Sequence, residues 1–263
     1  MISSQTFMTT IDIMKQKSII SVLFAGLALM LACQPKQQQV EQTEQKQPSI
    51  MVLDSGEVYT DSLLHQAELG IDSAQFLLAK AYYLGRGIDA DEHKAFEWMK
   101  KSAEQGYFKA QSWLGLYYNS GVSVAPDKEK AKEWYLKAIQ SQPNDSVTMF
   151  NLSGLYFQEE DYEHAWYWVN ESAKRNYAPA FHFVACFYYH GFGGIVEKNQ
   201  EEALKWFVKA AESGYPPAQY LLGLGYDYGY DVPQDHNKAL YWIRKAAENG
   251  YQEANEKLKE MEK

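Results

Sequence analysis

Histidine and cysteine side chains that could bind a metal recur in one stretch of the sequence. His182, Cys186 and His190 are spaced by four residues, so two of them can share one face of a helix, as paired zinc ligands do. The third drifts around the helix, and the only other cysteine of the chain is Cys33. The alternative is that Cys186 is a small buried apolar residue and the histidines line a groove. We predict no metal and no other cofactor.

Carboxylates and glycine loops are the other groups that could do chemistry. The acidic runs at residues 159–161 and 201–202 read as a solvated turn and as a helix start, where carboxylates interact favourably with the helix N-terminus. The glycine loops at residues 85–87 and 191–194 follow no predicted strand, which a phosphate-binding loop requires. The sequence therefore indicates that the protein is not an enzyme.

The charge of the chain bears on its partners. It has 25 basic and 34 acidic residues, which gives a formal net charge of −9. An acidic chain without a basic stripe repels phosphate, so we predict no nucleic-acid partner.

The elements that position these residues repeat along the chain, and such self-similarity indicates a repeat architecture. Five tryptophans recur every 34 to 38 residues, each three residues after an alanine: Trp98, Trp134, Trp168, Trp206 and Trp242. Residues 110–121 show the spacing of one buried helix face and end in a glycine loop. Asp127 is then a suitable N-cap for a second helix. Each unit is therefore predicted to be a helix, a loop and a second helix.

The first unit illustrates the pattern, and the residues that carry it are Ala74, Leu78, Ala79, Tyr82, Gly85, Lys94, Ala95, Trp98 and Gly106. This pattern resembles the Sel-1-like repeat, a relative of the tetratricopeptide repeat, over residues 61–257. The resemblance implies an all-α fold, an α/α superhelical solenoid of about five helix pairs with capping helices, over residues 61–263. The third unit has a short acidic turn in place of the glycine loop, and the fourth has two extra residues after Gly191.

The N-terminal residues read as targeting segments and not as part of the fold. Residues 1–32 are predicted to be a signal peptide, for which Met14 is an alternative start. An apolar run ends at Ala32-Cys33, which resembles the lipobox of bacterial lipoproteins and implies that Cys33 is lipidated. The other interpretation is an ordinary signal peptide followed by a chance cysteine. Residues 33–60 are predicted to form a flexible glutamine-rich tether.

These features together predict a lipid-anchored scaffold of the bacterial cell envelope, on the outer membrane and facing the periplasm. We expect it to bind a peptide or protein partner in a concave groove formed by the first helices. The predicted binding residues are Phe76, Tyr83, Asn119, Asn151, His182, Tyr189, His190, Tyr220, Asp227 and Tyr228. The alternatives are a glycan- or peptidoglycan-binding module and a β-lactam hydrolase. Cysteine-rich members of the family suggest the latter, but this chain lacks their cysteine pairs.

Overall fold

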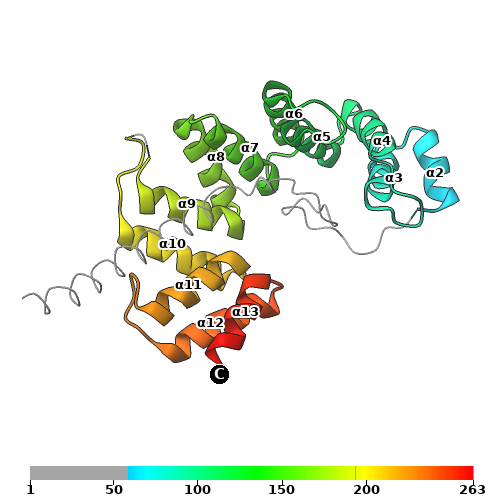
Figure 1. Ribbon diagram of the computed structural model, residues 1–263. Helices are drawn as coiled ribbons and strands as arrows, with labels where there is room; N and C mark the ends of the chain where they lie inside the picture. Colours follow the sequence, from blue (N-terminus) through cyan, green and yellow to red (C-terminus); the bar gives the residue numbers. More distant parts are fainter. Residues whose placement is uncertain (1–58, 193, 263) are drawn as a thin grey trace, which may run out of the picture. The chain divides into compact units, whose positions relative to one another are not determined.

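The computed structural model describes residues 59–192 and 194–262, which belong to a compact unit of residues 50–263 (Figure 1). The predicted signal peptide, Cys33 and nearly all of the predicted tether lie outside the described residues. Within the described part the chain forms twelve α-helices. They are α2 Asp61–Glu68, α3 Asp72–Leu84, α4 Glu92–Glu104, α5 Phe108–Ser120, α6 Lys128–Ser141, α7 Ser146–Gln158, α8 Tyr162–Lys174, α9 Ala178–His190, α10 Gln200–Glu212, α11 Pro216–Tyr228, α12 His236–Glu248 and α13 Gln252–Met261. None of these described helices is both long and apolar enough to cross a membrane.

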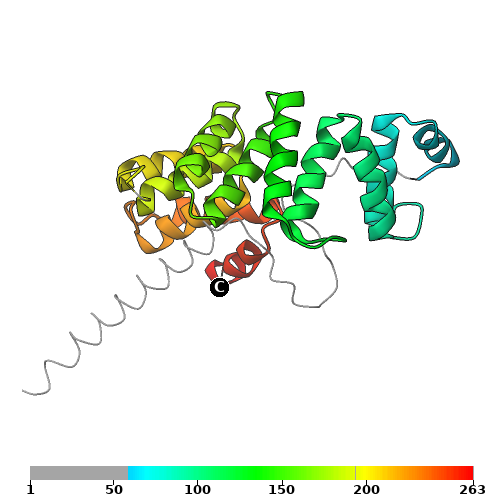
Figure 2. The same cartoon turned by 90° about the horizontal axis from the view of Figure 1, so that it is seen from above.

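The helices pack as five successive pairs, which confirms the predicted all-α repeat superhelix. The first helices are α3, α5, α7, α9 and α11, and their second helices are α4, α6, α8, α10 and α12. Each second helix also packs against the first helix of the next pair (Figures 1 and 2). The pairs are numbered below as repeats one to five. Helix α2 packs on α3 at one end, and the largely polar α13 packs on α12 at the other, so both ends are capped as predicted.

Short polar residues start the second helices. The side chains of four equivalent residues each accept a hydrogen bond of 2.9–3.0 Å from the N–H three positions later: Asp91, Asp127, Asn199 and Asp235. Such N-caps satisfy backbone donors that lack an intrahelical partner, and the predicted role of Asp127 is confirmed. The first helices of repeats one, two and five end at glycines in the left-handed conformation, which carries no side-chain penalty for glycine: Gly85, Gly121 and Gly229.

Two other glycines allow a first helix to approach its second helix closely. A Cβ atom on Gly115 would lie 2.7 Å from the ring of Tyr135, and one on Gly223 would lie 2.7 Å from the Cδ1 atom of Ile243. Tyr135 and Ile243 are fully buried. The missing side chain is therefore what sets the distance between the two helices of repeats two and five.

The five periodic tryptophans are half-buried on the second helices. In three repeats the lysine three residues later covers the ring, with Nζ 4.0 Å from the ring centroid of Trp98, 4.3 Å from that of Trp134 and 4.8 Å from that of Trp206. A cation over an aromatic face is attractive. The W-x2-K spacing of the sequence therefore has a local structural basis, because it places the lysine over the ring of a tryptophan one turn earlier in the same helix.

The two irregular repeats differ in their loops as the sequence predicts. A short turn joins α7 to α8, whereas the loop between α9 and α10 contains an isolated β-bridge between Phe192 and Val196. The ring of Phe192 lies 5.2 Å from that of Phe157 and 5.1 Å from that of Tyr162. These two rings flank the short turn of repeat three. The longer loop of repeat four therefore fills the space beside the turn.

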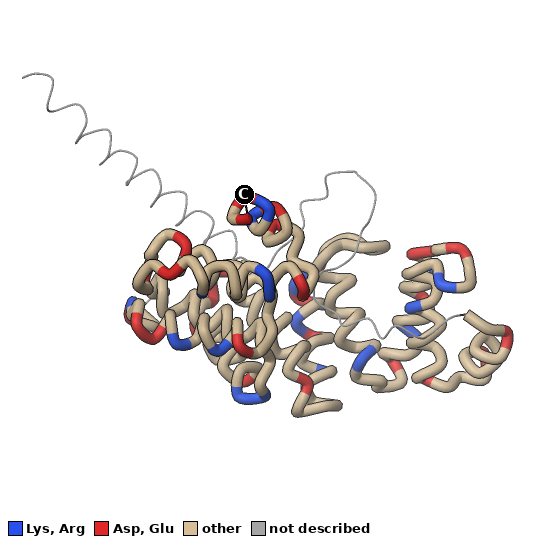
Figure 3. Tube along the Cα trace, turned by 90° about the horizontal axis from the view of Figure 1, so that it is seen from below, with Lys and Arg blue, Asp and Glu red and all other residues tan. Residues whose placement is uncertain are grey.

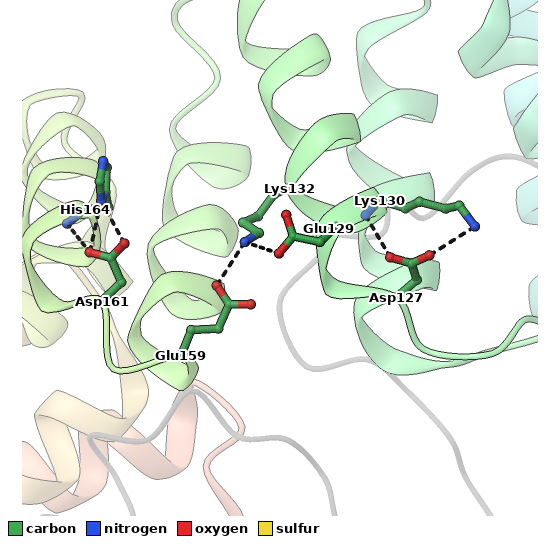
Figure 4. Close-up of polar contacts among 7 residues, drawn as sticks. All are labelled: Asp127, Glu129, Lys130, Lys132, Glu159, Asp161 and His164. Carbon is green, nitrogen blue, oxygen red and sulfur yellow. Dashed lines mark hydrogen bonds and ion pairs between the residues drawn. The ribbon is translucent and has the colours of Figure 1, made fainter.

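Charged side chains are interspersed along the described helices and form no basic stripe in the view of Figure 3. Most of the ion pairs in the described part join residues three or four positions apart, within one helix or at its end, but Lys132 of α6 joins two repeats (Figure 4). Its Nζ atom lies 2.6 Å from Glu129 and 3.2 Å from Glu159, the residue that follows α7. Part of the acidic turn of repeat three is thus held to repeat two.

Candidate functional site

The predicted binding residues fall at equivalent places on the first helices. Phe76, His182 and Tyr220 are each the fifth residue of their helix. The twelfth residues are Tyr83, Asn119, Tyr189 and Asp227, and the thirteenth are His190 and Tyr228. Asn151 is the sixth residue of α7. These places have different surroundings.

The fifth residue of a first helix packs against the tyrosine that precedes the next first helix. The ring centroids are 5.4 Å apart for Phe76 and Tyr107, 5.3 Å for His182 and Tyr215, and 5.1 Å for Tyr220 and Tyr251. Phe76 is 4% exposed and His182 is 3% exposed. The structure thus places these two predicted residues in the interior, where they join one repeat to the next.

The twelfth residue of a first helix meets the sixth residue of the next first helix. In repeat one the rings of Tyr83 and Trp113 lie 5.7 Å apart, and in repeat three those of Phe157 and Phe183 lie 5.1 Å apart. In repeat five the Oδ2 atom of Asp227 lies 2.8 Å from Nζ of Lys257, the sixth residue of α13. Successive first helices therefore contact one another along one face. We call this the first-helix face. The predicted residues at these two places are Tyr83, Asn119, Asn151, Tyr189 and Asp227, and Lys257 ties Tyr228 to Asp227 at its end.

Asn119 and Asn151 occupy this same pair of places in repeats two and three. These places bring together two rings at the ends of repeats one and three and two charges at the end of repeat five. Between repeats two and three they supply two amides. The Oδ1 atom of Asn119 is buried and accepts no hydrogen bond within the described part of the chain. Because buried polar atoms are nearly always hydrogen-bonded in proteins, an unpaired amide oxygen at this place is unusual for a side chain that serves packing alone.

The histidine and cysteine positions do not assemble a metal centre. Across the described residues there is no group of three His, Cys, Asp or Glu side chains placed to hold a metal ion. The ring of His182 also packs against Phe207 at 5.2 Å, and Cys186 is 1% exposed. These two side chains are part of the core of repeat four.

Repeat five ends in a cluster of exposed tyrosines held by an ion pair. Tyr228 is 53% exposed and Tyr230 is 38% exposed, and their rings lie 5.5 Å apart. Lys257 Nζ donates to the Tyr228 hydroxyl at 3.1 Å and pairs with Asp227. Burial lowers the pKa of Lys257, but its hydrogen bonds to Asp227 and Tyr228 outweigh burial and raise it. The lysine is therefore charged and fixes both partners in place.

Repeat four contributes Tyr189 and His190 beside this cluster. The pKa of Tyr189 is raised by burial and by the carboxylate of Asp231, which belongs to the loop after α11. Tyr189 is therefore within electrostatic reach of the repeat-five loop. Burial and the charge of Lys198 lower the pKa of His190, so its ring is neutral at pH 7. Tyr189 and the Tyr228 cluster thus share one electrostatic neighbourhood, whereas the ring contacts of His190, to Tyr189 and Phe192, lie within repeat four.

The sequence interpretation missed three residues of this neighbourhood. Tyr230 and Asp231 continue a run that alternates tyrosine with aspartate or glycine over residues 226–231, and this alternation was the available signal. Lys257 lies in α13, which corresponds to a predicted capping helix, and nothing in its spacing marks it as part of a site. Its role could be recognised only from the place of α13 as a sixth first helix.

Comparison with known proteins identifies the repeats. The family model described as Sel1 repeat matches residues 72–107, 108–142, 149–177, 178–215 and 216–251, which is more than half of the chain. The matched segments follow the five helix pairs of the structure.

Solved structures and one curated protein are similar to this chain. A Sel1 repeat protein from Oxalobacter formigenes is 30% identical with a TM-score of 0.63, over 71% of this chain and 76% of that one. A protective antigen of uropathogenic Escherichia coli strains that displays an SLR fold is 28% identical with a TM-score of 0.54, over 76% of this chain and 51% of that one. Chitin synthase regulatory factor 3 of Schizosaccharomyces pombe is 38% identical over 69 residues. That match covers 26% of this chain but spans only 7% of the curated relative.

Proposed function

Because this chain belongs to the Sel1 repeat family, we propose that it is a non-enzymatic scaffold that binds a protein or an extended peptide on its first-helix face. Repeat folds of this kind typically mediate protein–protein interaction. They do so because stacked repeats present an extended surface built from equivalent positions.

The observation that supports the proposal is that the side chains at equivalent positions of this face differ in chemical type from repeat to repeat. The paired positions of successive first helices hold aromatic rings in repeat one, two amides in repeat two and an ion pair in repeat five. A packing role alone would be met by apolar side chains throughout. The exposed ring of Tyr228 is an aromatic group of the kind that anchors peptide ligands.

Site-specific photo-crosslinking in the native cell tests this proposal. A photoreactive amino acid in place of Tyr189 should give one discrete protein adduct. The matched control is the same substitution at Tyr167, which is 56% exposed on the second helix α8 and should give none. Equal adducts at both positions, or none at Tyr189, would remove the assignment to the first-helix face. Adducts with glycan and not with protein would favour the glycan-binding alternative.

We also propose that Cys33 is lipidated and holds the scaffold on the periplasmic side of the outer membrane. The support is the sequence alone, through the charged start, the apolar run and Ala32-Cys33. Replacing Cys33→Ser should move the protein from the membrane to the soluble fraction, and metabolic labelling with a fatty acid should be lost. Retention of the label in this variant would contradict the proposal.

A further inference from the structure

The described helices repeatedly place a lysine between a tyrosine ring and a carboxylate. In each case Nζ lies 5.1–5.4 Å from a ring centroid and 3.0–3.7 Å from an aspartate oxygen. The three sets are Lys94 with Tyr82 and Asp91, Lys130 with Tyr118 and Asp127, and Lys238 with Tyr226 and Asp235. The ring and the carboxylate both attract the ammonium group.

A fourth set of this kind closes the end of the first-helix face. Lys257 Nζ lies 4.9 Å from the ring centroid of Tyr228 and 2.8 Å from Asp227. The Lys257 and Asp227 side chains are only 14% and 17% exposed. Screening by solvent is weak for a pair covered to this extent, so the set is a fixed part of the surface.

Tyr230 and Asp231 present the same two groups without a cation. In the described part of the chain no lysine or arginine lies over the Tyr230 ring, and no ion pair involves Asp231. The Tyr230 ring is tilted by 35° against Tyr228, so the two rings form a partly exposed platform. The carboxylate of Asp231 is exposed and close enough to Tyr189 to raise the pKa of that hydroxyl, after burial.

We propose that Tyr230 and Asp231, on the platform shared with Tyr228, bind a lysine or arginine side chain of a basic segment in the protein partner. This inference rests on the proposed function and adds the charge of the partner to it. The net charge of −9 favours approach of a basic segment. Arginine fits best, because its planar guanidinium stacks on an aromatic ring while it donates to a carboxylate.

Titration of the purified full-length protein with a blocked hexa-arginine peptide tests this inference by calorimetry. The matched probe is the same peptide with citrulline in place of arginine, which keeps the shape and removes the charge. We expect binding of the arginine peptide and at least tenfold weaker binding of the citrulline peptide. Tyr230→Ala and Asp231→Asn should each weaken binding of the arginine peptide by several-fold or more.

Two control variants separate this site from general attraction to an acidic protein. Glu212→Gln removes one exposed carboxylate elsewhere, and Tyr241→Ala removes a tyrosine that is 53% exposed on α12; neither should change the affinity. Equal weakening by Glu212→Gln and Asp231→Asn, or equal binding of both peptides, would overturn the inference. The inference would also be overturned if the protein bound a peptidoglycan fragment and not the arginine peptide, and if Tyr230→Ala abolished that binding. If the crosslinked protein adduct at Tyr189 survives such a result, the scaffold proposal stands and only the basic partner is wrong.

Discussion

The ring of Phe192, in the lengthened loop of repeat four, lies 5.2 Å from the ring of Phe157, at the end of the first helix of repeat three. Phe192 also packs against Phe187 at 5.1 Å. Repeat three has a short turn in place of the glycine loop, and Tyr162 beside that turn lies 5.1 Å from the Phe192 ring. The lengthened loop of repeat four therefore packs against the repeat whose own loop is short.

Substitution of Phe192→Ala should destabilise the protein by about 1–3 kcal/mol. This is less than the loss of a fully buried phenylalanine, because Phe192 is only half-buried. Urea unfolding of the two proteins measures the difference. Ile195→Ala in the same loop is the control, since Ile195 is 40% exposed and should change little. An unchanged midpoint for Phe192→Ala would mean that the two loops are independent.

Substitution of Gly223→Ala should destabilise repeat five, although alanine is the better helix former by about 1 kcal/mol. The new Cβ atom would lie 2.7 Å from Cδ1 of Ile243, and overpacking of this kind costs roughly 1–3 kcal/mol. The sign of the change in the free energy of unfolding therefore decides between propensity and packing. A stabilised variant would show that the two helices are not in close contact.

Substitution of Trp206→Ala should cost about 2–4 kcal/mol. The indole packs on Phe181 at 5.7 Å and is covered by Lys209 at 4.8 Å, but it is only half-buried, so the cost lies somewhat below that of a buried tryptophan. Tyr241→Ala, at an exposed position of an equivalent helix, should change stability by about 0.5 kcal/mol or less. Similar thermal midpoints for both variants would contradict the structural role of the repeating tryptophans.

Stability should fall in mild acid because of His190. Folding lowers the pKa of this histidine through burial and Lys198, so the unfolded chain binds the proton more readily than the folded chain. The stability that His190 contributes is therefore present above the ordinary histidine pKa of about 6.5. It is lost as the pH falls from there through the lowered pKa of the folded state. Urea unfolding of the protein and of His190→Gln between about pH 5 and 7.5 measures this. The variant should lose part of the pH dependence, and an identical slope would exclude His190 as its source.

The sequence predicted the fold well because the tryptophan, alanine and glycine positions recur in phase and each has a local physical role. Asp127 as an N-cap is an example that depends only on neighbouring residues. The binding residues were harder to predict than the fold, because the helical period alone does not distinguish a residue that faces the next repeat from one that faces solvent. Phe76 and His182 share a helix position with Tyr220, but they are buried. Lys257 could be assigned only after α13 was seen to continue the row of first helices.

The central claim is that binding resides on the first-helix face. The most direct test is to measure how much of the partner identified by crosslinking is captured by a double variant that carries no crosslinker. Tyr189→Ala with Tyr228→Ala should reduce capture by an order of magnitude or more, since one interface anchor contributes about 2 kcal/mol. The matched control is Tyr167→Ala with Tyr241→Ala, two tyrosines that are 56% and 53% exposed on second helices. Circular dichroism should show that both double variants are folded. The account predicts loss of capture for the first pair and full capture for the second; full capture by a folded Tyr189→Ala, Tyr228→Ala protein would contradict it.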